Sequence, residues 1–163
     1  MSGPRVNYYK HVGKAAQHLM AIEELLEQTT LGPKLLELIR LRTSQINGCS
    51  FCVNYHTQVL GLLEETPERN NQAAVWEEAP CFTAQEKAAF RWAETLTKIA
   101  DTRYVNDDLY QATLDAWGEA GISELTLAVG MINTWNRLGI AFHTDHGFID
   151  QLLRAKRNEL AHA

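Results

Sequence analysis

The sequence contains no apolar stretch that approaches the roughly 20 residues needed to span a bilayer as a helix. Its first residues, MSGPRVNYYKHVGKAAQ, lack the apolar core of a secretory signal, so we expect a cytoplasmic protein with no membrane partner. An excess of positive charge is also missing. The net charge of −5 at pH 7 provides no electrostatic footprint for nucleic acid or anionic lipid, so we expect no nucleic-acid partner.

Cysteine is scarce, and three residues are an odd number for a disulfide-stabilised scaffold. Two of them, Cys49 and Cys52, are separated by only two residues. In a cytoplasmic chain, closely spaced cysteines are more often catalytic or metal-binding than structural. The third, Cys81, stands alone, and we interpret it as an incidental thiol.

The alternation of apolar and polar residues that indicates β-strands is absent, and so are internal repeats, low-complexity tracts and domain linkers. Apolar residues recur instead at helical spacing. We therefore expect one all-α domain over residues 1–163, a compact bundle of six to seven helices with its core at about 7–142. A charged tail at 147–163 is expected to form a loose terminal helix at most. The predicted helices cover about 11–28, 33–46, 49–63, 68–77, 83–100, 107–117 and 123–143.

Residues that suit helix ends mark the boundaries of these segments. Capping side chains, proline in a first turn and glycine after a last turn accommodate the backbone groups that a helix leaves unpaired. The longest predicted helix is apolar nearly all round, so we expect it to be buried in the domain centre or partly in a subunit interface. On it, Gly130 and Gly139 would let neighbouring helices approach closely. The boundary residues are Pro33, Gly48, Thr83 with Glu86 as a capping box, Asn106, and Ser123 after a turn at 118–121.

One stretch combines thiol, imidazole and carboxylate groups. Cys49 and Cys52 begin a predicted helix, His56 follows one turn later, and Glu37 lies on the preceding helix. At 3.6 residues per turn, the thiols and the imidazole fall within an arc of about 60° on the inward face. A helix N-terminus stabilises thiolates, and an imidazole with a carboxylate can relay protons. The pattern predicts a thiol redox site, in which a hydroperoxide oxidises one thiol and the second thiol resolves the sulfenic acid.

Other uses of the same residues remain as alternatives. Zinc requires a fourth ligand, which Cys81, His143 or His146 could supply, but the customary second pair of cysteine or histidine ligands is missing. Covalent haem attachment requires a histidine directly after the second cysteine, and Val53 at that position excludes it. Two buried structural thiols are the simplest alternative, although such a pair rarely comes with a histidine and a carboxylate at this spacing.

Other polar residues have simpler explanations. For Glu37, the alternative to a proton relay is a surface ion pair with Arg40, three residues later. Asn133 and Arg137 are expected to have structural roles, satisfying helix ends or an interface. The histidine and aspartate side chains at 143–146 are expected to form a solvated helix end.

The spacing of Glu37, Cys49, Cys52 and His56 resembles the signature of the alkylhydroperoxidase D-like proteins, which belong to the carboxymuconolactone decarboxylase superfamily. The surrounding LLELIRLRTSQINGCSFCVNYHTQ is similar to short-chain members, and the resemblance covers about residues 7–142. It implies an all-helical fold, a trimeric or hexameric homo-oligomer, and thiol-dependent peroxidase or disulfide reductase activity. It also implies a hydroperoxide substrate and a thiol or dithiol reductant protein as partner, with no metal, haem or other cofactor.

The same resemblance implies that Cys52 is the peroxidatic thiol, Cys49 its resolving partner, and His56 with Glu37 the proton relay. The residues themselves leave the order of the thiols open, since the helix dipole favours Cys49 and proximity to His56 favours Cys52.

The sequence departs from the family's best-described peroxidases at one position. Those proteins have a second histidine just before the second cysteine, whereas Phe51 stands there in this chain, so we expect weaker or differently routed proton transfer. True decarboxylases of the superfamily lack the thiol pair, which argues against a lactone substrate. A non-enzymatic redox sensor or oligomeric scaffold that uses the same disulfide is the alternative function.

Overall fold

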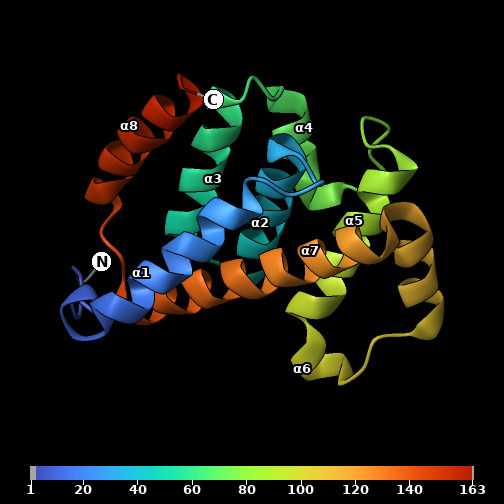
Figure 1. The fold of residues 1–163 in the computed structure, drawn as a ribbon, viewed down its shortest axis with the longest axis horizontal. Coiled ribbons are helices and arrows are strands. Elements are labelled where there is room, and N and C mark those ends of the chain that lie inside the picture. The colour runs from blue at the N-terminus through green and yellow to red at the C-terminus, as the bar shows by residue number, and fades with distance from the viewer. Residues whose placement is uncertain (1–2, 163) are drawn as a thin grey trace.

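The computed structural model describes residues 3–162, and within them it contains helices and no strand (Figure 1). The predicted all-α fold is therefore confirmed. None of the helices in this range is both long and apolar enough to cross a membrane. The elements are α1 (Tyr9–Leu26), α2 (Pro33–Asn47), α3 (Ser50–Leu62), α4 (Pro67–Gln72), the 3-10 turn η1 (Ala73–Val75), α5 (Ala84–Thr97), α6 (Ile99–Thr102), α7 (Asp107–Phe142), the 3-10 turn η2 (His146–Phe148) and α8 (Ile149–Leu160).

Most helix ends follow the predicted capping chemistry. Pro33 occupies the first turn of α2, and Gly48 ends that helix in the left-handed conformation, with φ of 72°. Thr83 and Glu86 form both halves of the capping box of α5, and Asn106 caps α7. These local signals therefore determine where α2, α5 and α7 begin or end.

The predicted boundary at Ser123 is wrong. Ser123 lies inside α7, where its hydroxyl donates a hydrogen bond to the Glu119 carbonyl oxygen at 2.6 Å. Within α7 the backbone departs from helical geometry at Gly118, which has φ of 67° and ψ of 178°. Because helical geometry resumes directly after this glycine, the two predicted helices at 107–117 and 123–143 become the two arms of one kinked element.

Helix α2 occupies the centre of the bundle. It packs against α3, α5 and α7, and nearly every side chain between positions 35 and 44 is buried, including polar ones. The segment before α1 reaches the far end of α7, where the Arg5 backbone N–H donates to the Phe142 carbonyl oxygen at 3.0 Å. The fully buried apolar residues of α2 are Leu36, Leu38, Ile39 and Leu41.

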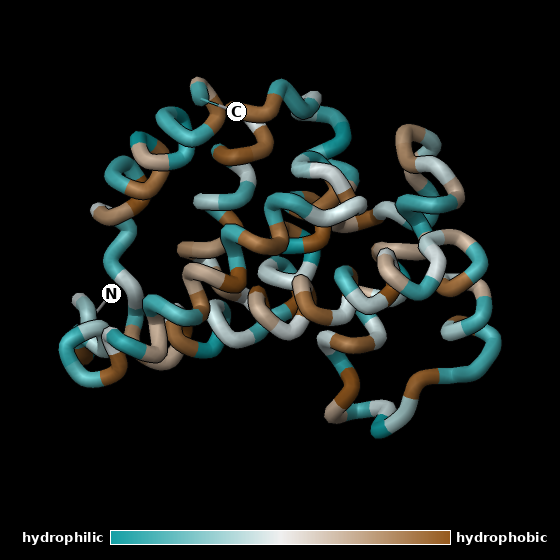
Figure 2. The backbone as a smooth tube through the Cα atoms, in the orientation of Figure 1, coloured by the Kyte–Doolittle hydropathy of each residue, from teal (hydrophilic) through white to brown (hydrophobic). Residues whose placement is uncertain are grey.

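The C-terminal helix α8 is packed on the protein, which differs from the loose tail we expected. Ile149 and Leu153 are buried and form an apolar cluster with Val59 of α3. Figure 2 shows hydrophilic and hydrophobic residues alternating along α8, as expected of a helix with one packed face. Lys156 adds an ion pair at 2.9 Å to Glu27, the C-cap residue of α1. Most residues of α8 are polar or charged, but Ile149 and Leu153, four positions apart, pack against α3.

Candidate functional site

The two cysteines lie where α2 ends and α3 begins. Gly48 turns the chain, and Cys49 is the N-cap residue of α3. Its Sγ accepts a hydrogen bond from the backbone N–H of Cys52 at 3.4 Å. The two residues are paired in a disulfide, with their Cα atoms 5.4 Å apart, and both are buried. A sulfur in this position is close to the unpaired N–H groups of a helix start, which stabilise a thiolate when the pair is reduced.

The disulfide lies against α7 at Gly139. A Cβ atom at Gly139 would lie 3.2 Å from Cys49 Sγ, which is a tight contact, and 3.8 Å from Cys52 Sγ, which is an ordinary van der Waals contact. The predicted close approach is thus confirmed at Gly139. It is wrong at Gly130, where a Cβ would have no neighbour within 4 Å. The other apolar residues around the disulfide are Phe51, Ile132 and Trp135.

These two glycines make a matched pair for mutagenesis. We expect Gly139→Ala to lower the free energy of unfolding of the oxidised protein by about 1 kcal/mol, because the added methyl overpacks the disulfide. The Gly130→Ala variant should instead be more stable by up to about 1 kcal/mol, through helix propensity alone. Urea denaturation of both variants measures this difference. A stabilised Gly139→Ala variant would show that the disulfide moves aside without cost.

Glu37 of α2 and His56 of α3 form a buried hydrogen-bonded pair. His56 Nδ1 lies 2.7 Å from Glu37 Oε2, and Arg40 Nη1 lies 2.5 Å from Glu37 Oε1. Burial opposes ionisation of Glu37, but the charges and hydrogen bonds of His56 and Arg40 outweigh it and lower the pKa of Glu37 to about 2. Because a carboxylate only accepts hydrogen bonds, Nδ1 carries the hydrogen, and Nε2 of a neutral ring keeps its lone pair.

The ion pair between Glu37 and Arg40 forms, but the expectation that it lies at the surface is wrong. Glu37 is 2% exposed and Arg40 is 5% exposed. Arg40 also contacts the carboxylates of Glu23 in α1 and of Glu27, the C-cap residue of α1. Glu23 in turn accepts a hydrogen bond from Trp135 Nε1 at 2.8 Å. Sequence reasoning missed these α1 residues because they precede Arg40 by 13 and 17 positions and carry no motif of their own.

The structure places the four predicted site residues in two adjoining pairs. Cys49 and Cys52 are joined to each other, and Glu37 and His56 are bonded to each other. His56 follows Cys52 by one turn of α3, as the sequence spacing requires. Their catalytic roles remain predictions.

Two contacts between aromatic rings lie beside this site. The ring of Phe51 meets the ring of His146 edge-on, with centroids 5.7 Å apart, and His146 Nε2 lies 3.3 Å from Ser50 Oγ. His146 is exposed, as we expected, but it also covers the first turn of α3. Tyr55 packs edge-on against His56, and burial together with the charge of Glu37 raises the pKa of its hydroxyl.

An amide cluster ties the end of α2 to α7. The side-chain nitrogen of Asn47 donates to Asn133 Oδ1 at 2.9 Å and to Asn136 Oδ1 at 2.8 Å, and Asn136 donates to Ser44 Oγ at 3.0 Å. Arg137 binds Asn133 in turn. These bonds confirm structural roles for Asn133 and Arg137, and they hold the segment that leads into Cys49.

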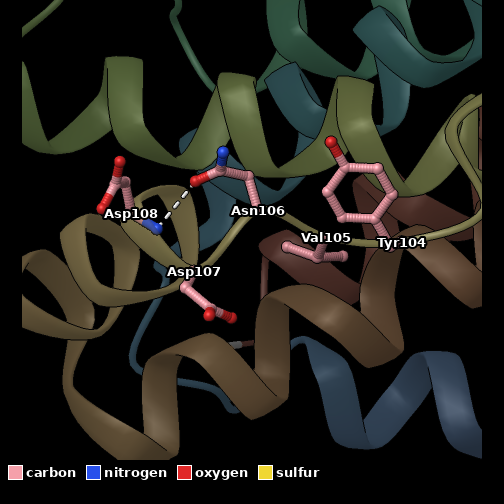
Figure 3. A pocket seen from close by; sticks show the side chains of 5 residues that line it. All are labelled: Tyr104, Val105, Asn106, Asp107 and Asp108. Atoms are coloured by element: carbon pink, nitrogen blue, oxygen red, sulfur yellow. Dashed lines mark hydrogen bonds between the residues drawn. The ribbon is translucent and has the colours of Figure 1, made fainter.

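Other polar features of the chain have structural explanations. The third cysteine, Cys81, donates to Gln72 Oε1 at 3.6 Å. Across residues 3–162, no three His, Cys, Asp or Glu side chains converge as a metal site. A surface pocket of about 270 Å³ lies before α7 and is lined by residues 104–108 (Figure 3). Asn106 Oδ1 accepts there from the backbone N–H of Asp108 at 2.7 Å, so this polar lining is the cap of α7.

Comparison with known proteins finds relatives in sequence. Residues 13–95 match the model of the carboxymuconolactone decarboxylase family. The uncharacterised protein YdfG of Bacillus subtilis (strain 168) is 34% identical over 137 residues, which are 84% of this chain and 92% of YdfG.

Two solved structures have the same fold. An Agrobacterium tumefaciens protein of unknown function, suggested to be the antioxidant defence protein AhpD, matches with a TM-score of 0.82 and 36% identity over 88% of this chain and 97% of its own. An uncharacterised peroxidase-related protein from Silicibacter sp. TM1040 matches with a TM-score of 0.71 over 79% of this chain and 68% of its own. At 18% identity, that likeness concerns the fold alone.

Proposed function

Because the chain belongs to the carboxymuconolactone decarboxylase family, we propose that it is a thiol-dependent peroxidase that cycles Cys49 and Cys52 between dithiol and disulfide. One observation supports this most directly: a cysteine pair at the start of α3 lies one turn from a buried histidine bonded to a carboxylate. The antioxidant role suggested for the Agrobacterium relative agrees with the proposal.

The proposed reaction begins with the reduced pair. Cys52 loses its proton to Nε2 of His56, and the thiolate attacks one oxygen of the hydroperoxide. The O–O bond breaks, an alcohol leaves with the proton, and Cys52 becomes a sulfenic acid. Cys49 then attacks the Cys52 sulfur, the S–S bond forms, and water leaves with the thiol proton of Cys49. The sum is two thiols and a hydroperoxide giving a disulfide, an alcohol and water, and neither metal nor haem takes part.

A reductant protein with a thiol or dithiol is needed to close the cycle, because the disulfide must be returned to two thiols. A cytoplasmic location belongs to the same proposal, since that compartment keeps such thiols reduced. We also propose a homo-oligomer, trimeric or hexameric, because large apolar side chains of α7 such as Tyr110, Leu127 and Ile140 are exposed in the single chain. Light scattering during size-exclusion chromatography measures the subunit number.

A thiol count after hydroperoxide treatment tests the proposal. The reduced protein has three free thiols, and one equivalent of hydroperoxide should leave one, at Cys81. A Cys81→Ser variant is the matched control, and its count should fall from two to none. Retention of all thiols under this treatment would refute the peroxidase.

Turnover separates the enzyme from the alternative redox sensor. With excess hydroperoxide and a dithiol reductant, a peroxidase consumes many equivalents per chain. A protein that oxidises once, and is not returned to the dithiol by candidate reductants, would instead be the sensor or scaffold.

A further inference from the structure

We propose that Arg40 is a positioning residue of this site, which holds the Glu37 carboxylate so that His56 keeps its hydrogen on Nδ1. The inference rests on the proposed function for the consequence to thiol chemistry, but the geometry that supports it does not depend on which oxidant reacts. Arg40 acts only through Glu37 and His56.

The Arg40 guanidinium is buried and is the centre of an ionic cluster. Its side chain is 6% exposed and contacts three carboxylates: Nη1 lies 2.5 Å from Glu37 Oε1 and 2.7 Å from Glu27 Oε1, and Nη2 is bonded to Glu23 Oε2. The planar guanidinium presents its donors in a fixed fork, so it cannot rotate without breaking several of these bonds at once. The orientation of Glu37 is therefore tied to α1 as well as to its own helix.

Each of the three carboxylates also contacts a second donor through the oxygen that does not contact Arg40. Glu23 accepts from Trp135 Nε1 of α7 at 2.8 Å, and Glu27 is paired with Lys156 Nζ of α8 at 2.9 Å. The second donor to Glu37 is His56 Nδ1 at 2.7 Å. Indole and ammonium can only donate, so the first two positions are fixed by chemistry. The imidazole is the one donor of the three that has a choice of tautomer, and the carboxylate of Glu37 decides that choice.

Charge balance explains why Arg40 is required to keep Glu37 ionised and the hydrogen of His56 on Nδ1. Three carboxylates, of which Glu37 is buried and Glu23 and Glu27 are partly exposed, face two permanent cations, Arg40 and Lys156, so this group has one excess negative charge. Without Arg40, Glu37 would lose the cation that contacts Oε1. The buried carboxylate would then be stabilised by taking up a proton or by rotating to another partner. A protonated Glu37 can donate to Nδ1, which would move the ring hydrogen to Nε2. A ring in that form cannot accept a thiol proton at Nε2.

The first test reads the tautomer directly. In the oxidised protein, at a pH where the ring is neutral, ¹⁵N chemical shifts of His56 should show hydrogen on Nδ1, and Arg40→Gln should move it toward Nε2. Arg40→Lys keeps a positive charge but lacks the planar guanidinium, so its tautomer population should lie between those of the wild type and Arg40→Gln. This variant also provides the test if Arg40→Gln does not fold. Arg42→Gln is the matched control, because Arg42 lies on the same helix and pairs with Glu94 of α5 at 2.6 Å. Wild-type tautomer in both Arg40 variants would overturn the proposal.

The second test follows the thiol without a hydroperoxide. Alkylation of reduced Cys52 by iodoacetamide near neutral pH, resolved by mass spectrometry, should slow about tenfold in Arg40→Gln and in His56→Ala. The double variant should be no slower than His56→Ala alone, because Arg40 acts through His56. Additive losses would overturn the proposal. The alkylation assay uses no hydroperoxide. If the wild type had no peroxidase activity, the proposed function would be refuted, but the alkylation rates of Cys52 would still test the role of Arg40.

Discussion

Replacing Cys52 with serine should lower the rate of hydroperoxide consumption by roughly a thousandfold or more, because the proposed nucleophile is removed. Replacing Cys49 should have a different effect. The first step would survive, one equivalent of hydroperoxide would be consumed, and the reaction would stop at a sulfenic acid on Cys52 that dimedone traps. Stopped-flow kinetics and mass spectrometry of the two variants distinguish these outcomes. Cys81→Ser is the control and should react like the wild type.

The two variants also determine which sulfur is attacked first. Cys49 Sγ is held by the backbone N–H of Cys52, which suits a stabilised thiolate, whereas Cys52 is the sulfur one turn before His56. If the sulfenic acid accumulates on Cys49 in the Cys52→Ser variant, the order of the thiols is reversed. The proposal of a redox-active pair would stand in that case, but the assignment of Cys52 as peroxidatic would fall.

The second large effect concerns Glu37, whose removal should cost stability in a pH-dependent way. The pKa of Glu37 is lowered from its ordinary value to about 2 in the folded protein. A depressed pKa means that the unfolded chain binds the proton more readily, so the stabilisation is complete above about pH 5 and is lost as the pH falls toward 2. We therefore expect Glu37→Gln to lower the free energy of unfolding near pH 7 by on the order of 3 kcal/mol.

Urea denaturation of the wild type and Glu37→Gln at pH 7, 5 and 3.5 measures this effect. The difference in stability between the two proteins should be nearly the same at pH 7 and pH 5 and should shrink at pH 3.5, below the ordinary pKa of a glutamate. Glu94→Gln is a useful comparison, because Glu94 also has a lowered pKa but is partly exposed beside Arg42, so its effect should be smaller. A difference that stays constant with pH would show that Glu37 acts by packing and hydrogen bonding without a net charge effect.

The sequence by itself determined those features that depend on neighbours a few residues apart. Helical periodicity identified the all-α class, and Pro33, Gly48, Thr83 and Asn106 marked helix ends through local backbone chemistry. The spacing of the cysteines at the start of α3 is local in the same sense, since residues one turn apart must share a face. These predictions needed no knowledge of which helices touch.

Only the tertiary structure decided what surrounds Glu37 and the disulfide. Arg40 is three residues from Glu37 and looked like its surface partner, but both are buried in the fold, and Glu23 and Glu27 bring two more carboxylates to the guanidinium from α1 and its C-cap. Docking of α8 and the approach of Gly139 to the sulfurs likewise join segments far apart in the chain. Burial sets the cost of each charge, and burial depends on which distant helices meet, so the pattern of residues along α2 could not reveal whether Glu37 lies in water or in a closed ionic cluster.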